Sequence, residues 1–259
     1  MGKNRLKQIF TSPTPLLSVY YSAGFPALEN TREIAQHLQE AGADLIEIGI
    51  PFSDPVADGP TIQASNKQAL DNGMTLGLLF EQIKDLRKTV SIPVLLMGYI
   101  NPVLQYGVER FCQACKAVGI DGLILPDLPL AEYEQEYKTI FDAHDLSNIF
   151  LVTPQTSHER IRLIDGLSDT FIYVVSSASI TGAKKGISEE QITYLEGIRQ
   201  MGLQNPTLVG FGVSEAATFE TISRYASGAI VGSAFIHLLS NSKNLKNDIS
   251  EFVKSIKRP

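Results

Sequence analysis

The chain has 259 residues, 44% hydrophobic and 19% charged, a composition typical of a globular protein with a large buried core. Its 28 acidic residues outnumber its 22 scattered basic ones, so no surface for nucleic acid or anionic lipid is expected. The sequence opens without a signal peptide, and no apolar run approaches the roughly 18 residues that span a bilayer, so we expect a cytoplasmic protein without a membrane partner.

Short runs of aliphatic and β-branched residues alternate with longer amphipathic segments along the whole chain. This alternation is typical of a parallel sheet whose strands are connected by helices. The eight predicted strands are Leu16–Ser22, Leu45–Ile50, Val94–Met97, Gly122–Leu125, Asn148–Val152, Phe171–Val175, Thr207–Val209 and Ala229–Val231.

Amphipathic patterns predict helices between these strands. Glycines Gly42, Gly119 and Gly228 each stand before an apolar run, as a short helix-to-strand loop requires. The predicted helices are Leu28–Ala41, Ile62–Asp71 with a further piece Leu76–Lys88, Val108–Val118, Glu132–Ala143, His158–Ile164, Glu189–Met201, Ala216–Tyr225 and a last stretch ending near Ile256.

Eight strands with intervening helices favour a closed barrel, since an open doubly wound sheet usually has about five or six strands and a glycine-rich fingerprint after the first. No such fingerprint follows Leu16–Ser22, and no linker divides the chain. We therefore predict an α/β fold, a (β/α)8 TIM barrel with extra short helices, formed by residues 1–259 as one domain. Its active site should lie at the carboxyl ends of the strands.

A carboxylate interrupts the second predicted strand, which reads Leu45-Ile46-Glu47-Ile48-Gly49-Ile50. Both faces of a barrel strand are buried, so Glu47 is out of water whichever way it points. If it faces the barrel axis, desolvation should raise its pKa and suit it to general acid/base catalysis near neutral pH. The alternative is a structural glutamate paired with a basic side chain, although no lysine or arginine stands at a neighbouring strand end.

The loop after this strand, residues 51–60, carries three prolines and two aspartates. Prolines limit the freedom of the loop, so it could hold Asp58 over the barrel mouth. The residues leave another reading equally open, in which Asp54 or Asp58 is a solvated turn residue or caps the helix at Thr61.

Glycines follow the last two predicted strands, as Gly210-Phe211-Gly212 and Gly232-Ser233. Barrels commonly bind phosphate with backbone N–H groups at these two loops, so a phosphorylated substrate is expected, unless the glycines only tighten turns. The stretch Ser176–Gly186 after the sixth strand is long and rich in small residues, and we interpret it as a lid.

Metal and Schiff-base chemistry are poorly supported. None of the four histidines and no lysine lies at a predicted strand end, and no metal site is expected. Cys112 and Cys115 form a C-x-x-C inside a predicted helix without a second pair, which favours a structural role over a redox or zinc site. Acid/base catalysis by carboxylates remains.

Residues Ile46–Gln63, read as IEIGIPFSDPVADGPTIQ, closely resemble the signature of the tryptophan synthase α chain family. Further agreement follows in the family's order across the whole chain. The matching strings are Met97–Pro102, Pro126–Pro129, Thr181–Gly182, Gly210–Gly212 and Gly232–Ser233.

The resemblance implies a carbon-carbon lyase of tryptophan biosynthesis that cleaves indole-3-glycerol phosphate by retro-aldol chemistry. Glu47 would protonate indole C3 and take the glycerol hydroxyl proton, while Asp58 would hydrogen-bond the indole N–H and, when the lid closes, contact Thr181. Tyr173 would lie near the substrate and the glutamate. The other residues that the family places at the substrate are Tyr20, Gly182, Phe211, Gly212, Gly232 and Ser233, with the phosphate held by amides around the glycines and Ser233.

The family also implies a partner, a β subunit that carries pyridoxal phosphate, receives indole through a tunnel and activates this chain in an α2β2 heterotetramer. No cofactor is implied on this chain itself. Loop 51–60 and Asn101-Pro102 would contact the partner.

Two departures stand out: Tyr20 replaces a frequent phenylalanine beside the indole, and Ser177–Ile180 lacks the usual arginine and glycine. The alternatives are another phosphate-binding barrel, such as a sugar-phosphate isomerase, and a subunit that only gates its partner.

Overall fold

The computed structural model describes residues 2–175, 186–210 and 212–257, and its centre is a closed parallel barrel. Neighbouring strands follow chain order from β1 to β8, and β8 pairs with β1. The predicted (β/α)8 barrel is therefore confirmed. The strands are β1 (Leu16–Ser22), β2 (Leu45–Gly49), β3 (Val94–Met97), β4 (Gly122–Ile124), β5 (Ser147–Val152), β6 (Ile172–Val175), β7 (Thr207–Gly210) and β8 (Gly228–Val231).

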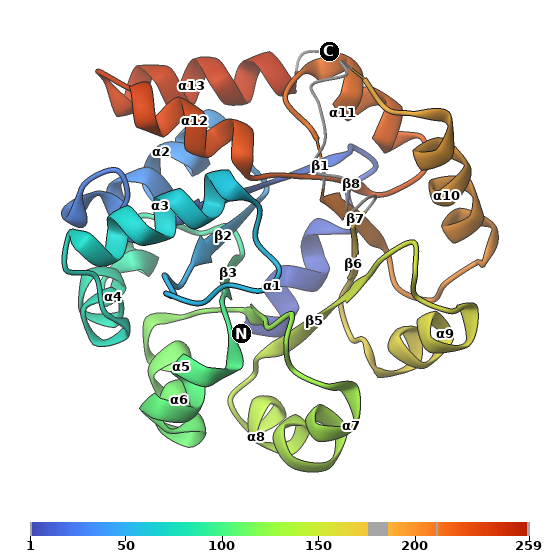
Figure 1. Ribbon diagram of the computed structural model, residues 1–259, viewed down its shortest axis with the longest axis horizontal. Coiled ribbons are helices and arrows are strands. Elements are labelled where there is room, and N and C mark those ends of the chain that lie inside the picture. Colours follow the sequence, from blue (N-terminus) through green and yellow to red (C-terminus); the bar gives the residue numbers. More distant parts are fainter. Residues whose placement is uncertain (1, 176–185, 211, 258–259) are drawn as a thin grey trace.

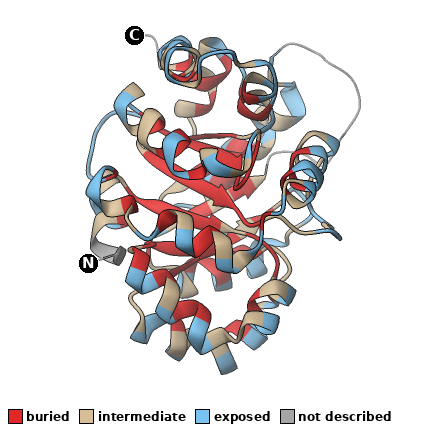
Figure 2. Ribbon diagram, turned by 90° about the vertical axis from the view of Figure 1, so that its left-hand side faces the viewer, coloured by how far each residue is buried: buried red, intermediate tan, exposed pale blue. Residues whose placement is uncertain are grey.

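Helices surround the barrel as an outer layer (Figure 1). Most of them bury apolar residues on the side that faces the barrel, and Figure 2 shows their buried residues on the inner side and their exposed residues on the outer side. Within the described residues, no helix has the length and apolar character needed to cross a membrane. The α-helices are α1 (Gly2–Ile9), α2 (Thr31–Ala41), α3 (Pro60–Asp71), α4 (Leu76–Ile83), α5 (Ile100–Tyr106), α6 (Val108–Val118), α7 (Leu130–Glu132), α8 (Lys138–Ala143), α9 (His158–Leu167), α10 (Glu189–Gln200), α11 (Ala216–Ser223), α12 (Ser233–Asn241) and α13 (Leu245–Ile256).

Two layers of apolar packing give the barrel its core. Alternate residues of each strand point inward, and the layer nearest the amino ends of the strands contains Leu45, Leu95, Phe171, Leu208 and Ile230. The outward residues pack under the helices in a second, larger cluster. Because the lower interior is filled with side chains, ligand chemistry is left to the carboxyl ends of the strands.

Helix α1 closes the amino end of the barrel. Leu6 is fully buried against the inward layer, and the Phe10 ring lies 5.5 Å from that of Phe171. Figure 1 shows this helix inside the ring formed by the others. The sequence did not predict α1. Its only large apolar residues are Leu6 and Ile9, which are too few to show a helical period.

Asp121 connects α1 and the short 3-10 turn Leu86–Lys88, which follows α4, to the barrel. It lies just before β4 with no exposed surface, and its carboxylate accepts hydrogen bonds from Arg5 Nε at 2.8 Å and from the backbone N–H of Val94 at 2.7 Å. Arg5 donates to Oδ1, whereas Arg87 Nη2 donates to Oδ2 of the same carboxylate. Arg87 Nη2 also donates to the carbonyl of Gly119. One buried charge thus joins segments more than a hundred residues apart.

Several predicted elements differ in detail. The last predicted helix is two, α12 and α13, because the chain turns at Ser242 to Asn244, where Asp248 accepts three hydrogen bonds. Helix α5 was not predicted; its Pro102 stands in the first turn, where a missing N–H costs nothing. The predicted helix Glu132–Ala143 contains a π-helical turn.

The three predicted helix-ending glycines do not all behave alike. Gly42 and Gly119 end α2 and α6 in the left-handed region, with φ of 98° and 82°, as predicted. Gly228 instead begins β8, and the prediction that it ends a helix was wrong. A Cβ there would lie 2.0 Å from the carbonyl oxygen of Leu16, so close strand packing explains this glycine.

Candidate active site

Glu47 lies inside the barrel near its carboxyl end. Its residue has no exposed surface, its Oε1 accepts a hydrogen bond from Ser18 Oγ at 2.7 Å, and its Oε2 has no partner. Burial raises the pKa of this carboxyl from 4.5 to about 7, opposed by the Ser18 hydrogen bond. The partner is a hydroxyl and not a basic side chain, so Glu47 is not one half of a structural ion pair.

Two tyrosines stand over glycines beside Glu47. A Cβ on Gly49 would lie 2.2 Å from Tyr20 Oη, and one on Gly210 would lie 2.2 Å from Tyr173 Oη. Desolvation is the main cause that raises the pKa of both phenols, and the charges of Glu47 and Asp58 raise both further. The structure therefore brings Tyr20, Tyr173 and the two carboxylates together at one end of the barrel.

Gly49→Ala tests whether the Tyr20 ring needs the space over this strand. We expect a loss of about 1–3 kcal/mol in unfolding free energy, because the ring has to leave its position or the strand has to shift. Gly197→Ala in α10 is the matched control: nothing lies within 4 Å of its Cβ, and it should stabilise by about 0.5–1 kcal/mol. Urea unfolding measures both, and equal behaviour of the two variants would contradict the close packing of Tyr20.

Asp58 stands on the loop after β2, half-buried at the barrel mouth. Desolvation raises the pKa of its carboxyl, and a hydrogen bond with the Tyr99 phenol, beyond β3, opposes the rise. Tyr99 Oη also accepts from the backbone N–H of Ala57 at 3.0 Å, and its ring stacks 5.4 Å from that of Phe52. The N-cap of α3 is Gly59 and no side chain caps this helix, so Asp58 is not a helix cap. Asp54 is exposed.

The extra hydroxyl of Tyr20 finds a partner within its own strand. Tyr20 Oη lies 3.4 Å from Ser22 Oγ, and the residue is 5% exposed. The phenol that departs from the usual phenylalanine is therefore not stranded among apolar side chains.

The glycine loops after β7 and β8 lie at the same end of the barrel. Gly212 has a φ of 62°, which favours glycine, and Gly232 caps α12, whose first residue is the exposed Ser233. A helix start with free N–H groups suits an anion. Thr181, Gly182 and Phe211, and the lid stretch Ser177–Ile180, lie outside the described residues.

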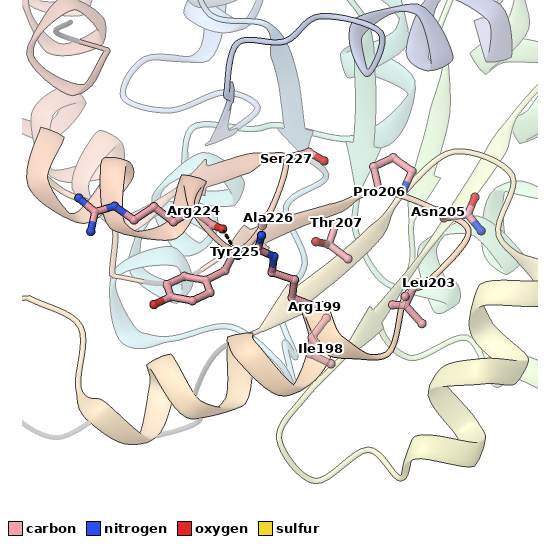
Figure 3. Close-up of a pocket in the computed structure, with 11 residues that line it drawn as sticks. Ile198, Arg199, Leu203, Asn205, Pro206, Thr207, Arg224, Tyr225, Ala226 and Ser227 are labelled. Carbon is pink, nitrogen blue, oxygen red and sulfur yellow. Dashed lines mark hydrogen bonds between the residues drawn. The ribbon is translucent and has the colours of Figure 1, made fainter.

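Two hollows among the described residues do not include Glu47 in their lining. The one in Figure 3, of about 310 Å³, lies at the amino ends of β7 and β8, between Arg199 and Arg224, and contains neither predicted carboxylate. A second, of about 570 Å³, lies between Phe52 and the outer side of α3. In the described parts of the chain, no three His, Cys, Asp or Glu side chains are grouped to hold a metal.

The cysteines are buried in α6 and unpaired with each other. Burial raises the pKa of the Cys112 thiol to about 12 and that of Cys115 well above its usual value, so neither is a ready thiolate. This agrees with the structural role expected from the sequence.

Sequence reasoning missed Ser18, Ser22 and Asn66 near the two carboxylates. Ser18 could have been found, since strand alternation places it two residues from Tyr20 on the inward face. Asn66 could not, because a polar residue in a helix gives no sign of pointing toward the barrel mouth.

The sequence and the structure of this chain are both similar to those of known proteins. The sequence model of a family described as tryptophan synthase alpha chain matches residues 7–258. The tryptophan synthase alpha chain of Flavobacterium johnsoniae is 56% identical to this chain, and the match covers 98% of this chain and 100% of the relative.

Solved structures agree. Tryptophan synthase subunit alpha from Legionella pneumophila is 32% identical, with a TM-score of 0.88 over 99% of this chain and 97% of that one. A chain of a tryptophan synthase complex from Pyrococcus furiosus is 33% identical, with a TM-score of 0.82 over 93% of this chain and 97% of that one.

Such identity over nearly the full length excludes an isomerase that merely shares the barrel. The chain belongs to the tryptophan synthase alpha chain family, lyases that cleave indole-3-glycerol phosphate to indole and glyceraldehyde 3-phosphate in tryptophan biosynthesis.

Proposed function

We propose that Glu47 is the general acid and base of this cleavage and that Asp58 stabilises the positive charge on the indole ring. The observation that carries the proposal is a fully buried carboxyl with one unpartnered oxygen and a pKa of about 7. At neutral pH such a group exists in both protonation states, as a residue that gives and takes a proton in one cycle requires.

The proton balance of the reaction fits a single shuttle. Protonated Glu47 gives its proton to indole C3, and the resulting carboxylate takes the proton of the hydroxyl on the adjacent glycerol carbon. The bond between C3 and that carbon then breaks, its electrons return to the ring, and the carbonyl of the aldehyde forms. Glu47 ends in the state in which it began, so no cofactor is required on this chain.

Asp58 acts on the ring nitrogen. Protonation at C3 places positive charge on the indole ring, and an ionised Asp58 that accepts the N–H hydrogen bond stabilises that charge. The Tyr99 phenol donates to the same carboxyl and favours its charged form. Tyr20 and Tyr173 would line the space for the indole.

The phosphate of the substrate would lie between the two glycine loops. The start of α12, at Gly232 and Ser233, offers backbone N–H groups, and Gly212 lets the opposite backbone approach closely. We include Thr181, Gly182 and Phe211 in the proposed substrate site on the family resemblance alone.

We also propose a β subunit as partner, in an α2β2 heterotetramer, with pyridoxal phosphate on the partner. The similar chain from Pyrococcus furiosus comes from a tryptophan synthase complex, which supports the partner. Val56 and Leu104 are 80% and 46% exposed, on the loop after β2 and on α5 after β3. We place the contact surface at these two side chains, because they follow neighbouring strands of the barrel.

The role of Asp58 is tested by indole release from indole-3-glycerol phosphate. Asp58→Asn should lower kcat by about 100-fold, because the amide cannot offset charge on the ring. Asp54→Asn, on the same loop but exposed, is the control and should keep wild-type turnover in the isolated chain. Each enzyme is assayed with and without a β subunit. A wild-type chain that stays inactive with its partner would instead support a subunit that only gates the β reaction.

A further inference from the structure

A chain of buried polar side chains connects β1, α3 and Asp58. Ser22, Ser65 and Asn66 are 0%, 1% and 2% exposed, although all carry polar groups. Ser22 Oγ lies 2.9 Å from Asn66 Oδ1 and 2.7 Å from Ser65 Oγ. Such groups are expensive to bury, so their arrangement calls for a reason beyond packing.

The two ends of the Asn66 amide have different partners. Its Oδ1 accepts the hydrogen bond from the Ser22 hydroxyl, and its Nδ2 points at Oδ2 of Asp58, 3.4 Å away. A carboxylate oxygen can only accept, so the amide nitrogen has to face Asp58, and the Ser22 hydroxyl, which donates to Oδ1, stabilises this direction of the amide. If the amide were reversed, its oxygen would face a carboxylate oxygen and the two would repel each other.

Ser22 is itself held in place. Ser65 Oγ has one proton, which it donates either to Ser22 Oγ or to the carbonyl of Ile62 in the same helix, 2.9 Å away. Tyr20 Oη lies 3.4 Å from Ser22 Oγ on the other side. Residues of β1 and α3 therefore surround the Asn66 amide together.

We propose that Asn66 is a positioning residue for Asp58, which it holds in its ionised form and in one orientation through Nδ2, while the Ser22 hydroxyl stabilises this direction of the amide by donating to Oδ1. This inference rests on the role proposed for Asp58. Asn66 would then act on the indole ring only through the carboxylate, without touching the substrate.

The charged and titratable groups that face Asp58 define what else could move its titration. Tyr99 donates to it from the loop after β3, and the phenols of Tyr20 and Tyr173 face it from β1 and β6. Glu47 from β2 interacts with the same two tyrosines. Asn66 is a donor to Asp58 that does not titrate, so its removal changes hydrogen bonding to Asp58 without adding or removing a charge.

The test is the pH profile of kcat/KM for indole release. The proposed mechanism requires ionised Asp58 and protonated Glu47, so the acidic limb reports Asp58 and the alkaline limb reports Glu47. Asn66→Leu should move the acidic limb to higher pH and lower kcat/KM about tenfold on that limb, because the carboxylate loses a donor. Its alkaline limb should stay in place.

Two further variants separate positioning from folding. Asn72, the residue that caps the carboxyl end of α3, donates its amide to the carbonyls of Gly24 and Pro26. Asn72→Leu should therefore lower the unfolding free energy without moving either limb of the pH profile. Ser18→Ala removes the donor to Glu47, so the pKa of Glu47 should rise. Only the alkaline limb of the profile should then move, to higher pH. Should Asn66→Leu fail to fold, Ser22→Ala frees the amide and should move the acidic limb in the same direction.

A readout independent of turnover completes the test. The ¹³C resonance of the Asp58 carboxyl, followed against pH, should show a higher pKa in Asn66→Leu than in wild type and none of this change in Asn72→Leu. An unchanged Asp58 titration with unchanged acidic limbs in Asn66→Leu and Ser22→Ala would overturn the inference. If Asp58→Asn itself kept full turnover, the role of Asp58 would fail first, which distinguishes the two failures.

Discussion

Glu47→Gln should lower kcat for indole release by about 1,000-fold to 10,000-fold and at the same time make the folded chain more stable above pH 7. The loss of turnover follows because glutamine can neither give the proton to indole C3 nor take one from the glycerol hydroxyl. Substrate binding should survive, since the substitution keeps the shape of the side chain.

The gain in stability follows from the pKa of Glu47. Its folded value of about 7 lies above the ordinary 4.5, so between these two pH values the folded chain holds a proton that the unfolded chain has released. Stability therefore falls as the pH rises through this window and stays lower above it. The full difference amounts to about 3 kcal/mol, which Glu47→Gln escapes.

Urea unfolding of both proteins at pH 5 and pH 8 measures this effect. The stability difference between Glu47→Gln and wild type should be larger at pH 8. Glu220→Gln, at an exposed position of α11, is the control and should change neither turnover nor the pH dependence. A difference that is the same at both pH values would show that Glu47 ionises as in water, and would remove the physical basis of its acid/base role.

Asp121→Ala should destabilise the fold by about 3–5 kcal/mol, because it leaves the guanidinium groups of Arg5 and Arg87 without their shared anion. The backbone N–H of Val94 loses its acceptor as well. Activity per folded molecule should stay near that of wild type, since all these contacts lie at the amino ends of the strands.

An exposed ion pair supplies the comparison for Asp121. Lys67 and Asp71 lie 2.6 Å apart on α3 with side chains 76% and 63% exposed, so Asp71→Ala should cost at most about 0.5 kcal/mol. Urea unfolding at pH 7 measures both variants. A loss below about 1 kcal/mol for Asp121→Ala would mean that water replaces the carboxylate between the two arginines.

The sequence alone predicted the fold well where burial is uniform. Strands β1 and β3 have the predicted bounds, because their runs are mostly aliphatic or aromatic and are followed by glycine within two residues, at Gly24 and Gly98. Helix α1 could not be predicted, since its burial depends on the barrel that it closes. Gly228 could not be assigned either, because only the closeness of Leu16 reveals why a side chain is excluded there.

The candidate site divides in the same way. Glu47 was predicted because a carboxylate in a buried strand is exceptional in any sequence. The alternatives for Asp58 could not be separated from its loop sequence; the hydrogen bond with the Tyr99 phenol, from another strand end, and the N-cap of α3 at Gly59 favour the mouth position. Asn66 is linked to Asp58 only through tertiary contacts, which no local pattern encodes.

Helix α1 also has a consequence for the order in which the protein assembles. Leu6 packs on a layer that includes Leu208 from β7 and Ile230 from β8, so its binding surface is incomplete until the last strand of the barrel has been synthesised. Those two residues follow Leu6 by more than two hundred positions in the chain. Full docking of α1 therefore requires strands that are synthesised after it, and its docking reports that the ring of strands has closed.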